Sequence, residues 1–344
     1  MKAAIGLSGG VDSAVAAYLL KQQGYEVTGV ILRLKPGSAA DSDIADAAAI
    51  AEKLGIELKI LDRREAFEQN VIAPFISEYL NGRTPNPCIE CNKEIKFGVM
   101  LDYALEIGCD CIATGHYAKT EKQGGRYLLR RSQSAKDQSY FLFRLTQEQL
   151  SKTLFPLEGL TKDEIREIAL KAELPVAKKG DSQEICFVPD DDYIAYLASK
   201  NITSPKGNFI DKNGNVLGKH NGIINYTVGQ RKGLGAFGKP MFVNSINAAD
   251  NTVIIGENGT QYCRGLVADR LNFIAFDSLT EPLRADVKIR FRAKEQPALI
   301  TPLEGDRMQI IFDEPQRSIT PGQSAVIYNG DTVIGGGRII EQID

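Results

Sequence analysis

The stretch Gly6-Leu7-Ser8-Gly9-Gly10-Val11-Asp12-Ser13 decides the fold, because it stands between an apolar run and a helical pattern. The run Ala3-Ala4-Ile5 predicts a buried strand, and the apolar spacing after Ser13 predicts a helix. We call residues 6–13 the glycine loop. Its adjacent glycines allow close approach of the backbone, its serines offer hydroxyls, and the N–H groups at a helix start attract anions. The loop therefore predicts a phosphate site.

The pattern of the glycine loop excludes two common classes of nucleotide site. It lacks the lysine of G-x-x-x-x-G-K-[ST] and the third glycine of G-x-G-x-x-G. The run from Ser8 to Ser13 resembles the loop of the N-type ATP pyrophosphatases, which adenylate a substrate oxygen and release pyrophosphate. The alternative is an ordinary strand-to-helix turn in which Ser8 or Asp12 caps the helix.

Length and composition set broad limits on the function. A chain of 344 residues exceeds one ordinary domain, and its formal net charge of -3 gives no general attraction for nucleic acid. The apolar run at the N-terminus is too short for a signal peptide and no run is long enough for a membrane span, so we expect a cytoplasmic protein with no membrane partner. The 6 cysteines then indicate chemistry or metal binding rather than a disulfide scaffold.

Strands alternate with helices in the first part of the chain. We expect strands over 25–34, 57–61 and 111–114, and helices over 41–54, 65–80 and 93–107. This alternation predicts an α/β fold with a parallel sheet covered by helices on both faces. Ligands of such sheets bind beyond the carboxyl ends of the strands, where the glycine loop and Gly115-His116 both fall.

Later segments predict a capped helix and then β structure. Thr161-Lys162-Asp163-Glu164 is a capping box, so we expect a helix to about Leu174, with a structural role. From Gly207 onward the residues alternate as in strands, with a hairpin signal at Asn213-Gly214. We expect an α/β domain over 1–198, a small β domain over 199–264 and a barrel-like β domain over 265–344.

Two thiols stand in a loop that Pro85 and Pro87 stiffen. Cys91 is expected just ahead of a helix and beside Lys93, which favours a lowered thiol pKa and a reactive thiolate. A zinc site formed by Cys88-x-x-Cys91 and Cys109-x-Cys111 is the alternative. The second pair argues against zinc, because successive residues of a strand point to opposite faces.

A further thiol, Cys186, follows in Gly180-Asp181-Ser182-Gln183-Glu184-Ile185-Cys186-Phe187, and alone it is typical of a small buried residue. Together with the glycine loop and the segment around Cys91, however, it resembles the tRNA-uridine 2-sulfurtransferases, which thiolate the wobble uridine of certain tRNAs. The resemblance covers essentially the whole chain. Further matches are Ala113-Thr114-Gly115-His116-Tyr117, Lys136-Asp137-Gln138-Ser139-Tyr140-Phe141-Leu142, Tyr226-Thr227-Val228-Gly229-Gln230-Arg231-Lys232-Gly233-Leu234 and Thr320-Pro321-Gly322-Gln323-Ser324-Ala325.

The resemblance implies roles for particular residues. Cys91 would be the catalytic cysteine, and Cys186 would carry a persulfide and form a disulfide with Cys91 during turnover. The ATP site would consist of Gly6, Leu7, Ser8, Gly9, Gly10, Val11, Asp12, Ser13, Leu32 and Gly115. The tRNA contacts would be Asn86, Pro87 and Cys88 at the target base, His116, Lys136, Asp137 and Gln138 nearby, and Arg290, Phe291 and Gln323 from the C-terminal β domain. Mg²⁺ is expected on the phosphates, and a persulfide-donating sulfur carrier or cysteine desulfurase is expected as partner.

The sequence departs from the family at two of these positions. Many members have Met at the position of Leu32. Some have Asp at the position of Cys88, and the thiol present here could compete with Cys91 for the disulfide. Attack by a persulfide and attack by hydrosulfide both remain open. The segment 180–187 is expected to be the mobile partner in sulfur transfer, because it has no proline until Pro189.

Two other functions remain in view. Another adenylating enzyme, such as an amidotransferase-type or argininosuccinate-type synthetase, would share the loop but would not need two thiols near 91 and 186. A zinc-stabilised RNA-binding module would use the cysteines without catalysis. His116 and His220 are the only histidines, and a lone histidine near a strand end is more often structural than catalytic.

Overall fold

The computed structural model describes residues 1–180 and 185–344, and the backbone alone over 38–40. The contacts divide the chain into two compact units. Unit 1 comprises Met1–Val71, Cys88–Gln183 and Asp331–Ile334, and unit 2 comprises Ile72–Pro87, Glu184–Gly330 and Gly335–Asp344. The chain therefore passes between the units several times, and each unit is assembled from segments that are distant in sequence.

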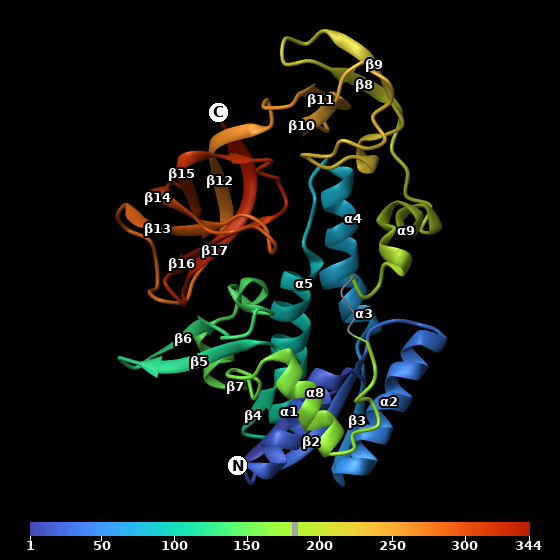
Figure 1. The fold of residues 1–344 in the computed structure, drawn as a ribbon, viewed down its shortest axis with the longest axis vertical. Helices are drawn as coiled ribbons and strands as arrows, with labels where there is room; N and C mark the ends of the chain where they lie inside the picture. The colour runs from blue at the N-terminus through green and yellow to red at the C-terminus, as the bar shows by residue number, and fades with distance from the viewer. Residues whose placement is uncertain (181–184) are drawn as a thin grey trace. The chain divides into compact units, whose positions relative to one another are not determined.

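Unit 1 contains a parallel sheet in the order β3-β2-β1-β4-β7, visible in the lower part of Figure 1. Its strands are β1 (Lys2–Gly6), β2 (Glu26–Arg33), β3 (Glu57–Asp62), β4 (Cys111–Ala113) and β7 (Thr153–Leu154). Every neighbouring pair in this order is parallel. The α/β class with a parallel sheet is thus confirmed, and the glycine loop leaves the carboxyl end of the central strand β1.

Helices cover both faces of this sheet, as the alternation along β1 requires. Ala3 and Ile5 face one core cluster together with residues of α1 (Val11–Gln22), α2 (Ser38–Leu54) and α8 (Lys162–Lys171). Gly6 points the other way, where a Cβ would lie 3.2 Å from Met100 Sδ of α6 (Met100–Glu106). Odd and even residues of one strand therefore serve different helical layers.

Two long predicted helices are composite. The first consists of α3 (Arg64–Phe67), the π-helix η1 (Glu68–Ile72) and α4 (Ala73–Leu80). The second consists of α5 (Pro87–Glu90), the π-helix η2 (Cys91–Val99) and α6. The predicted start of the second helix at residue 93 was wrong, because Pro87 fits the first helical position, where no N–H is required.

Three smaller differences concern single elements. Helix α2 begins at Ser38, three residues earlier than predicted. Helix α8 has the predicted capping box at Thr161 and Glu164, but it ends at Lys171 because Glu173 adopts φ +50°. A hairpin that was not predicted joins β5 (Ala118–Gln123) to β6 (Arg126–Arg131) through Gly124 and Gly125, both at positive φ. Residues 332 and 333 pair with β6.

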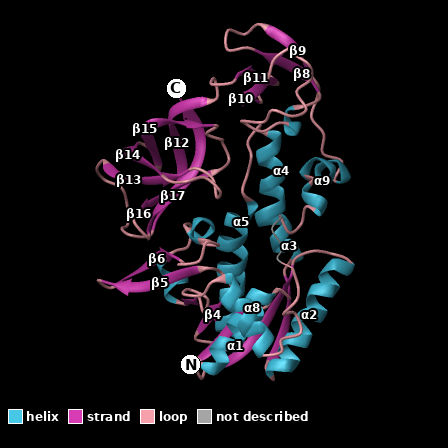
Figure 2. Cartoon of the chain, viewed as in Figure 1, coloured by secondary structure: helices cyan, strands magenta, loops and turns pink. Residues whose placement is uncertain are grey.

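Unit 2 is mostly β structure, shown in magenta in Figure 2. A small sheet has the order β10-β11-β8-β9, with strands β8 (Gly207–Ile210), β9 (Val216–His220), β10 (Met241–Asn247) and β11 (Thr252–Glu257). The strands β12 (Tyr262–Phe273), β15 (Arg307–Arg317), β14 (Gln296–Leu303), β13 (Leu283–Lys288), β16 (Ser324–Asn329) and β17 (Thr332–Ile343) follow one another in a second sheet. Pairing of β12 with β17 closes it into a barrel.

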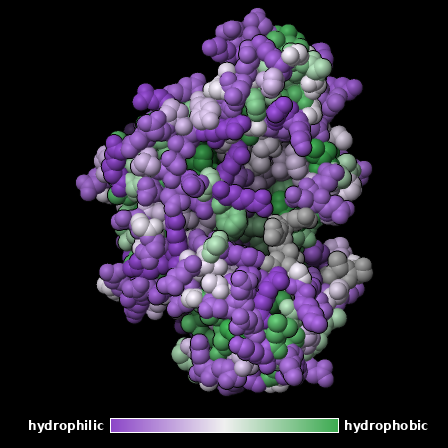
Figure 3. Space-filling view, viewed as in Figure 1, coloured by the Kyte–Doolittle hydropathy of each residue, from purple (hydrophilic) through white to green (hydrophobic). Residues whose placement is uncertain are grey.

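The helices of unit 2 include α4 and α9 (Tyr193–Ser199). The predicted β architecture with a barrel is confirmed, whereas the boundaries 1–198, 199–264 and 265–344 stay predictions. Within the described residues, no helix combines the length and the apolar character needed to cross a membrane. The face of the molecule in Figure 3 is largely hydrophilic, with hydrophobic side chains in small groups.

Candidate functional site

The glycine loop is a strand-to-helix turn at the carboxyl end of β1, the central strand of the unit 1 sheet. Leu7 N–H donates to Val30 O of β2 at 2.9 Å, which continues the sheet for one residue beyond β1. Gly9 then adopts φ +71°, and Gly10 is the N-cap of α1 without a side-chain cap. The first N–H groups of α1 thus have no capping side chain, so the alternative of a turn capped by Ser8 or Asp12 is not what the structure shows.

The two serines of the loop hold its shape from inside. Ser13 Oγ lies 3.1 Å from Gly10 O and accepts from Ser8 N at 3.2 Å, and the two hydroxyl oxygens are 3.2 Å apart. Ser13 is buried, whereas Ser8 is exposed. Ser13 therefore supports the backbone of the loop, and Ser8 is the hydroxyl that solvent or a ligand reaches.

Gly115, after strand β4, lies directly against the loop. A Cβ at this position would come within 2.8 Å of both Asp12 C and Ser13 N, and these are backbone atoms that cannot rotate away. Only glycine allows this approach. The structure thus brings the predicted nucleotide residue Gly115 and the glycine loop together, as expected for neighbouring parallel strands.

The Asp12 carboxylate connects the loop to two other elements. Its Oδ1 accepts from the Tyr117 hydroxyl at 2.8 Å and from Lys162 Nζ at 2.6 Å. Tyr117 is two residues after Gly115 in the chain, and Lys162 is the first residue of α8, within the capping box. The Lys162 side chain is only 12% exposed. The capped helix therefore places a lysine at the glycine loop, a role beyond the structural one that the sequence indicated.

Lys179 contacts the other end of the same loop. Its Nζ lies 3.0 Å from Gly9 O, 2.6 Å from Asp46 Oδ2 and 3.7 Å from Asp43 Oδ1. Both aspartates belong to α2, and Asp43 O is also the atom that a Cβ on Gly9 would meet at 2.9 Å. The lysine thus ties the left-handed turn of the loop to α2.

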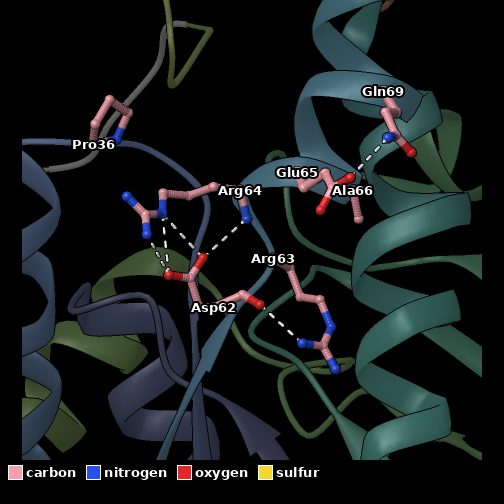
Figure 4. A pocket seen from close by; sticks show the side chains of 7 residues that line it. All are labelled: Pro36, Asp62, Arg63, Arg64, Glu65, Ala66 and Gln69. Carbon is pink, nitrogen blue, oxygen red and sulfur yellow. Dashed lines mark hydrogen bonds and ion pairs between the residues drawn. The ribbon is translucent and has the colours of Figure 1, made fainter.

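Leu32 lies at the same edge of the sheet, near the end of β2, where it pairs with Leu61 of β3. The residue after Leu61 is Asp62, which helps to form a pocket of about 730 Å³. Figure 4 shows the Asp62 carboxylate held by Arg64, and Arg63 donating to Asp62 O at 2.9 Å. The pocket lining is Pro36, Asp62, Arg63, Arg64, Glu65, Ala66 and Gln69. It therefore lies at the carboxyl ends of β2 and β3.

Cys91 occupies a helical position in unit 1. It is 7% exposed and begins the π-helix η2, one turn after the helix start at Pro87. The next residue, Asn92, donates from Nδ2 to Phe141 O at 3.2 Å, which fixes this turn against η3 (Ser139–Leu142). The expectation that Cys91 precedes the helix was wrong. Cys88, at the second helical position, is the thiol within the first turn, where the helix dipole acts.

The other cysteines of unit 1 do not form a metal site with these two. Cys109 and Cys111 are buried, and burial raises the pKa of both thiols, that of Cys111 to about 11. Cys111 Sγ lies 3.9 Å from Lys2 O. In the part of the chain that the structure describes, no group of three or more His, Cys, Asp or Glu side chains is arranged to hold a metal ion.

Cys186 belongs to unit 2 and is exposed, in contrast to the burial expected of a lone cysteine. The following Phe187 is buried, with its ring centroid 5.2 Å from that of Phe75 and 5.4 Å from that of Tyr196. Cys186 therefore immediately precedes a residue, Phe187, that is anchored between aromatic side chains of α4 and α9. Residues 181–184 of the segment predicted to be mobile lie outside the described residues.

Gln138, the last residue of the run Lys136-Asp137-Gln138, is bonded to Tyr117, whose hydroxyl donates to Asp12 of the glycine loop. Gln138 exchanges two hydrogen bonds with the Tyr117 backbone, at 2.8 and 3.1 Å. Asp137 accepts from the backbone and hydroxyl of Ser139. His116 is 9% exposed and bonded to Thr114 Oγ1 at 2.8 Å, and burial, aided by Lys96, holds its pKa well below the usual value.

Asn86 and Pro87, two of the residues predicted to contact the target base, lie at the end of a braced segment in unit 2. Thr84 N–H donates to Pro321 O at 2.9 Å, and Gln323 Nε2 donates to Thr84 O at 2.8 Å. Gln323 thus holds the backbone two residues before Asn86, a contact that sequence reasoning missed. The contact is not local in sequence, so no pattern could have revealed it.

Arg290 and Phe291 lie after β13 in unit 2. Arg290 Nη2 donates to Val228 O at 3.1 Å and Ser318 O at 2.9 Å, and to Thr320 Oγ1. The Lys288 ammonium lies 5.5 Å from the centre of the Phe291 ring. Arg290 therefore connects the barrel to residues 226–234, one of the segments that carry the family resemblance.

Three family models cover most of the chain. Residues 1–190 match the family described as tRNA methyl transferase HUP domain, 195–257 match tRNA methyl transferase PRC-barrel domain, and 263–339 match Aminomethyltransferase beta-barrel domain. Their order agrees with the α/β sheet, the small β sheet and the barrel described above. The descriptions name methyl transfer, whereas the full-length relatives are named for sulfur transfer.

Curated relatives match over almost the whole length. The chain is 52% identical over 354 aligned positions to tRNA-specific 2-thiouridylase MnmA of Clostridioides difficile, with 98% of each chain covered. It is 51% identical to the protein of the same name from Clostridium botulinum, with 99% of this chain and 98% of the relative covered. Among solved structures, the U34-tRNA thiolase NcsA from Methanococcus maripaludis is 22% identical, with 58% of this chain and 66% of that chain covered and a TM-score of 0.36, a similarity that supports no inference about function. The full-length identity shows that the chain belongs to the tRNA-specific 2-thiouridylase family, the tRNA-uridine 2-sulfurtransferases.

Proposed function

We propose that this enzyme adenylates the carbon-2 oxygen of the wobble uridine of tRNA with ATP, and then replaces that oxygen with sulfur from a cysteine persulfide. The observation that carries the proposal is the uncapped start of α1 behind the left-handed Gly9, at the carboxyl edge of the sheet. Backbone N–H groups in this arrangement bind phosphate oxygens. Leu32 and Gly115, which flank the loop on neighbouring strands, would line the rest of the nucleotide site.

The first step would activate a poor leaving group. The uridine oxygen attacks the α-phosphorus of ATP, the bond from that phosphorus to the bridging oxygen breaks, and pyrophosphate leaves from the glycine loop. Mg²⁺ would neutralise charge on the departing phosphates, and Asp12 would be the residue of the loop that offers it a carboxylate oxygen. The residues present fit such an ion, because Asp12 is part of the loop and is held in place by Tyr117 and Lys162.

The second step would transfer sulfur. The terminal sulfur of a Cys186 persulfide attacks carbon 2 and displaces AMP, after which the Cys91 thiolate attacks Cys186 Sγ. The products are 2-thiouridine and a Cys91–Cys186 disulfide, which a thiol reductant restores. In the other order, Cys91 attacks first and releases hydrosulfide, which then displaces AMP. Exposure of Cys186 supports loading by a sulfur carrier protein or a cysteine desulfurase.

The tRNA would be recognised from both units. We propose contacts of Asn86, Pro87 and Cys88 with the target base, and of His116 and the run 136–138 with nearby RNA. Arg290, Phe291 and Gln323 would contribute from the barrel side. Gln323 would act partly through Thr84, whose backbone it holds. The cytoplasmic location stays a prediction.

The test is reconstitution with the full chain, Mg²⁺, ATP, tRNA transcripts and either sulfide or a cysteine desulfurase with cysteine. We expect 2-thiouridine, measured by mass spectrometry of digested tRNA, together with one pyrophosphate for each adenylated uridine. Cys91→Ser and Cys186→Ser should stop tRNA thiolation when the desulfurase is the sulfur source, and both should spare ATP binding. Cys263→Ser is the matched control and should thiolate tRNA as the wild type does. The absence of thiolated uridine with every sulfur source would refute the proposal.

The two variants also separate the two routes of sulfur transfer. Thiolation by Cys186→Ser with free sulfide would support attack by hydrosulfide, and the same variant should still fail with the desulfurase. Peptide mapping after one turnover without reductant should find Cys91 joined to Cys186. A Cys88–Cys186 disulfide would instead assign the catalytic role to Cys88.

A further inference from the structure

The glycine loop carries an anion site without a cation of its own. Residues 6–13 contain no lysine or arginine, and the P-loop lysine is absent from the pattern. ATP brings several negative charges, which need positive charge as well as N–H donors. The structure places two lysine ammonium groups on this loop, and both come from much later in the chain.

Lys162 reaches the loop through Asp12. Its Nζ and the Tyr117 hydroxyl both bond Oδ1, so two elements fix one oxygen of the carboxylate. The ion pair is largely shielded from solvent, because the lysine side chain is 12% exposed and the aspartate side chain 31%. Such a pair holds the carboxylate in one orientation. It also balances the negative charge that Asp12 adds to a site for anions.

Lys179 reaches the loop through Gly9 O, at 3.0 Å. In a trans peptide the C=O and the following N–H point in opposite directions. A lysine bound to Gly9 O therefore sets the direction of the Gly10 N–H, the N-cap donor of α1. Asp46 Oδ2 of α2 accepts from the same ammonium group at 2.6 Å. The lysine therefore links the orientation of this peptide to the position of α2.

We propose that Lys162 and Lys179 are the positioning residues of the glycine loop, and that they offset the negative charge of the Asp12 and Asp46 carboxylates beside it. Lys162 orients Asp12, and Lys179 orients the Gly9–Gly10 peptide. This inference rests on the proposed function, because it takes the loop to be the site of the ATP phosphates. It assigns the fixing of the loop to one lysine at the start of α8 and to another in the segment after that helix.

The test measures ATP binding rather than turnover alone. Lys162→Met and Lys179→Met should each raise the dissociation constant of Mg·ATP at least about tenfold in calorimetric titration, the loss of one charge-assisted contact. The general effect of losing one lysine charge is controlled by Lys171→Met, on the exposed side of α8, and by Lys178→Met, the neighbour of Lys179. Both control side chains are exposed, and both variants should bind Mg·ATP as the wild type does.

Further readouts separate positioning from a merely structural role. Lys162→Met combined with Asp12→Asn should lose much less affinity than the sum of the two changes, because the lysine acts through the aspartate. Lys162→Met should also need more Mg²⁺ for half-maximal ATP binding, and Lys162→Arg should recover part of the affinity. If Lys162→Met does not fold, Lys162→Arg and Lys179→Met still decide the question.

The outcomes distinguish this inference from the proposed function. Wild-type affinity for Mg·ATP in folded Lys162→Met and Lys179→Met would overturn the inference, even if the enzyme thiolates tRNA. Strong ATP binding by the wild type without any thiolation would overturn the proposed function and leave the two lysines as positioning residues of an ATP site.

Discussion

Replacement of Gly115 by alanine should damage the glycine loop with the smallest possible change in chemistry. The added Cβ would lie 2.8 Å from Asp12 C and from Ser13 N, whereas ordinary contact begins at 3.4 Å. The two backbone segments must therefore separate by about 0.6 Å. Overpacking of this kind costs about 1–3 kcal/mol of folding stability.

The same displacement should weaken ATP binding. Phosphate oxygens bound by the first N–H groups of α1 would lose alignment with one or more of these donors. One hydrogen bond to a charged group contributes about 1.5–3 kcal/mol, and each 1.4 kcal/mol is about tenfold in affinity. We expect the dissociation constant of ATP to rise by about 10- to 100-fold.

The assay pairs calorimetric ATP titration with urea unfolding of the same preparations. Gly159→Ala is the matched control, because a Cβ there would meet no described atom within 4 Å and that glycine has no left-handed φ. It should match the wild type in affinity. Wild-type ATP affinity in Gly115→Ala, at any stability, would refute the argument that close contact with Gly115 shapes the nucleotide site.

Three other predictions concern the thiols, the histidines and the RNA. At pH 8, iodoacetamide should modify the exposed Cys186 within minutes while Cys111, buried and with its pKa raised to about 11, stays unmodified; rapid labelling of Cys111 in a peptide map of native protein would contradict this. Burial lowers the pKa of His116 and of His220 in the folded state, so their contribution to stability is fully present above the unfolded value of about 6.5 and is lost as the pH falls from there toward the folded pKa. Urea unfolding from pH 7.5 to 5.5 should show this loss, and a His116→Gln variant with an unchanged pH slope would show that His116 does not cause it. Despite the net charge of -3, tRNA binding measured by filter retention should weaken with salt by a logarithmic slope of about -0.9 for each phosphate contact on duplex, and an affinity that ignores salt would argue against an RNA substrate.

Local patterns predicted the parts of the fold that depend on neighbouring residues. The glycine loop between β1 and α1 and the capping box of α8 are both set by a few consecutive side chains, and both are confirmed. The hairpin of β5 and β6 also had a local signal, because Gly124 and Gly125 adopt the positive φ that such turns require. The start of the helix at Pro87 was missed because the prolines were interpreted as loop residues rather than as a first helical turn.

The candidate site depended on contacts that no local pattern contains. Lys162 meets Asp12 across 150 positions of sequence, and Gln323 meets Thr84 across 239. A capping box gives the same signal whether the next lysine points to solvent or to a ligand site. Sequence resemblance could therefore name the loop and the thiols, but the residues that hold them in place follow only from the tertiary structure.

The segmented make-up of the two units also bears on how the chain folds during synthesis. Unit 1 includes Asp331–Ile334, and residues 332 and 333 pair with β6, so the ribosome must finish nearly the entire polypeptide before the edge of β6 is covered. The hydrogen bonds of Thr84 also form late in synthesis, because their partners are Pro321 and Gln323. A nascent chain thus lacks the bonds that hold Thr84, two residues before the proposed base contact at Asn86, until the barrel emerges. Release of an active enzyme should consequently be a late, nearly all-at-once event in translation, and incomplete chains should be inactive.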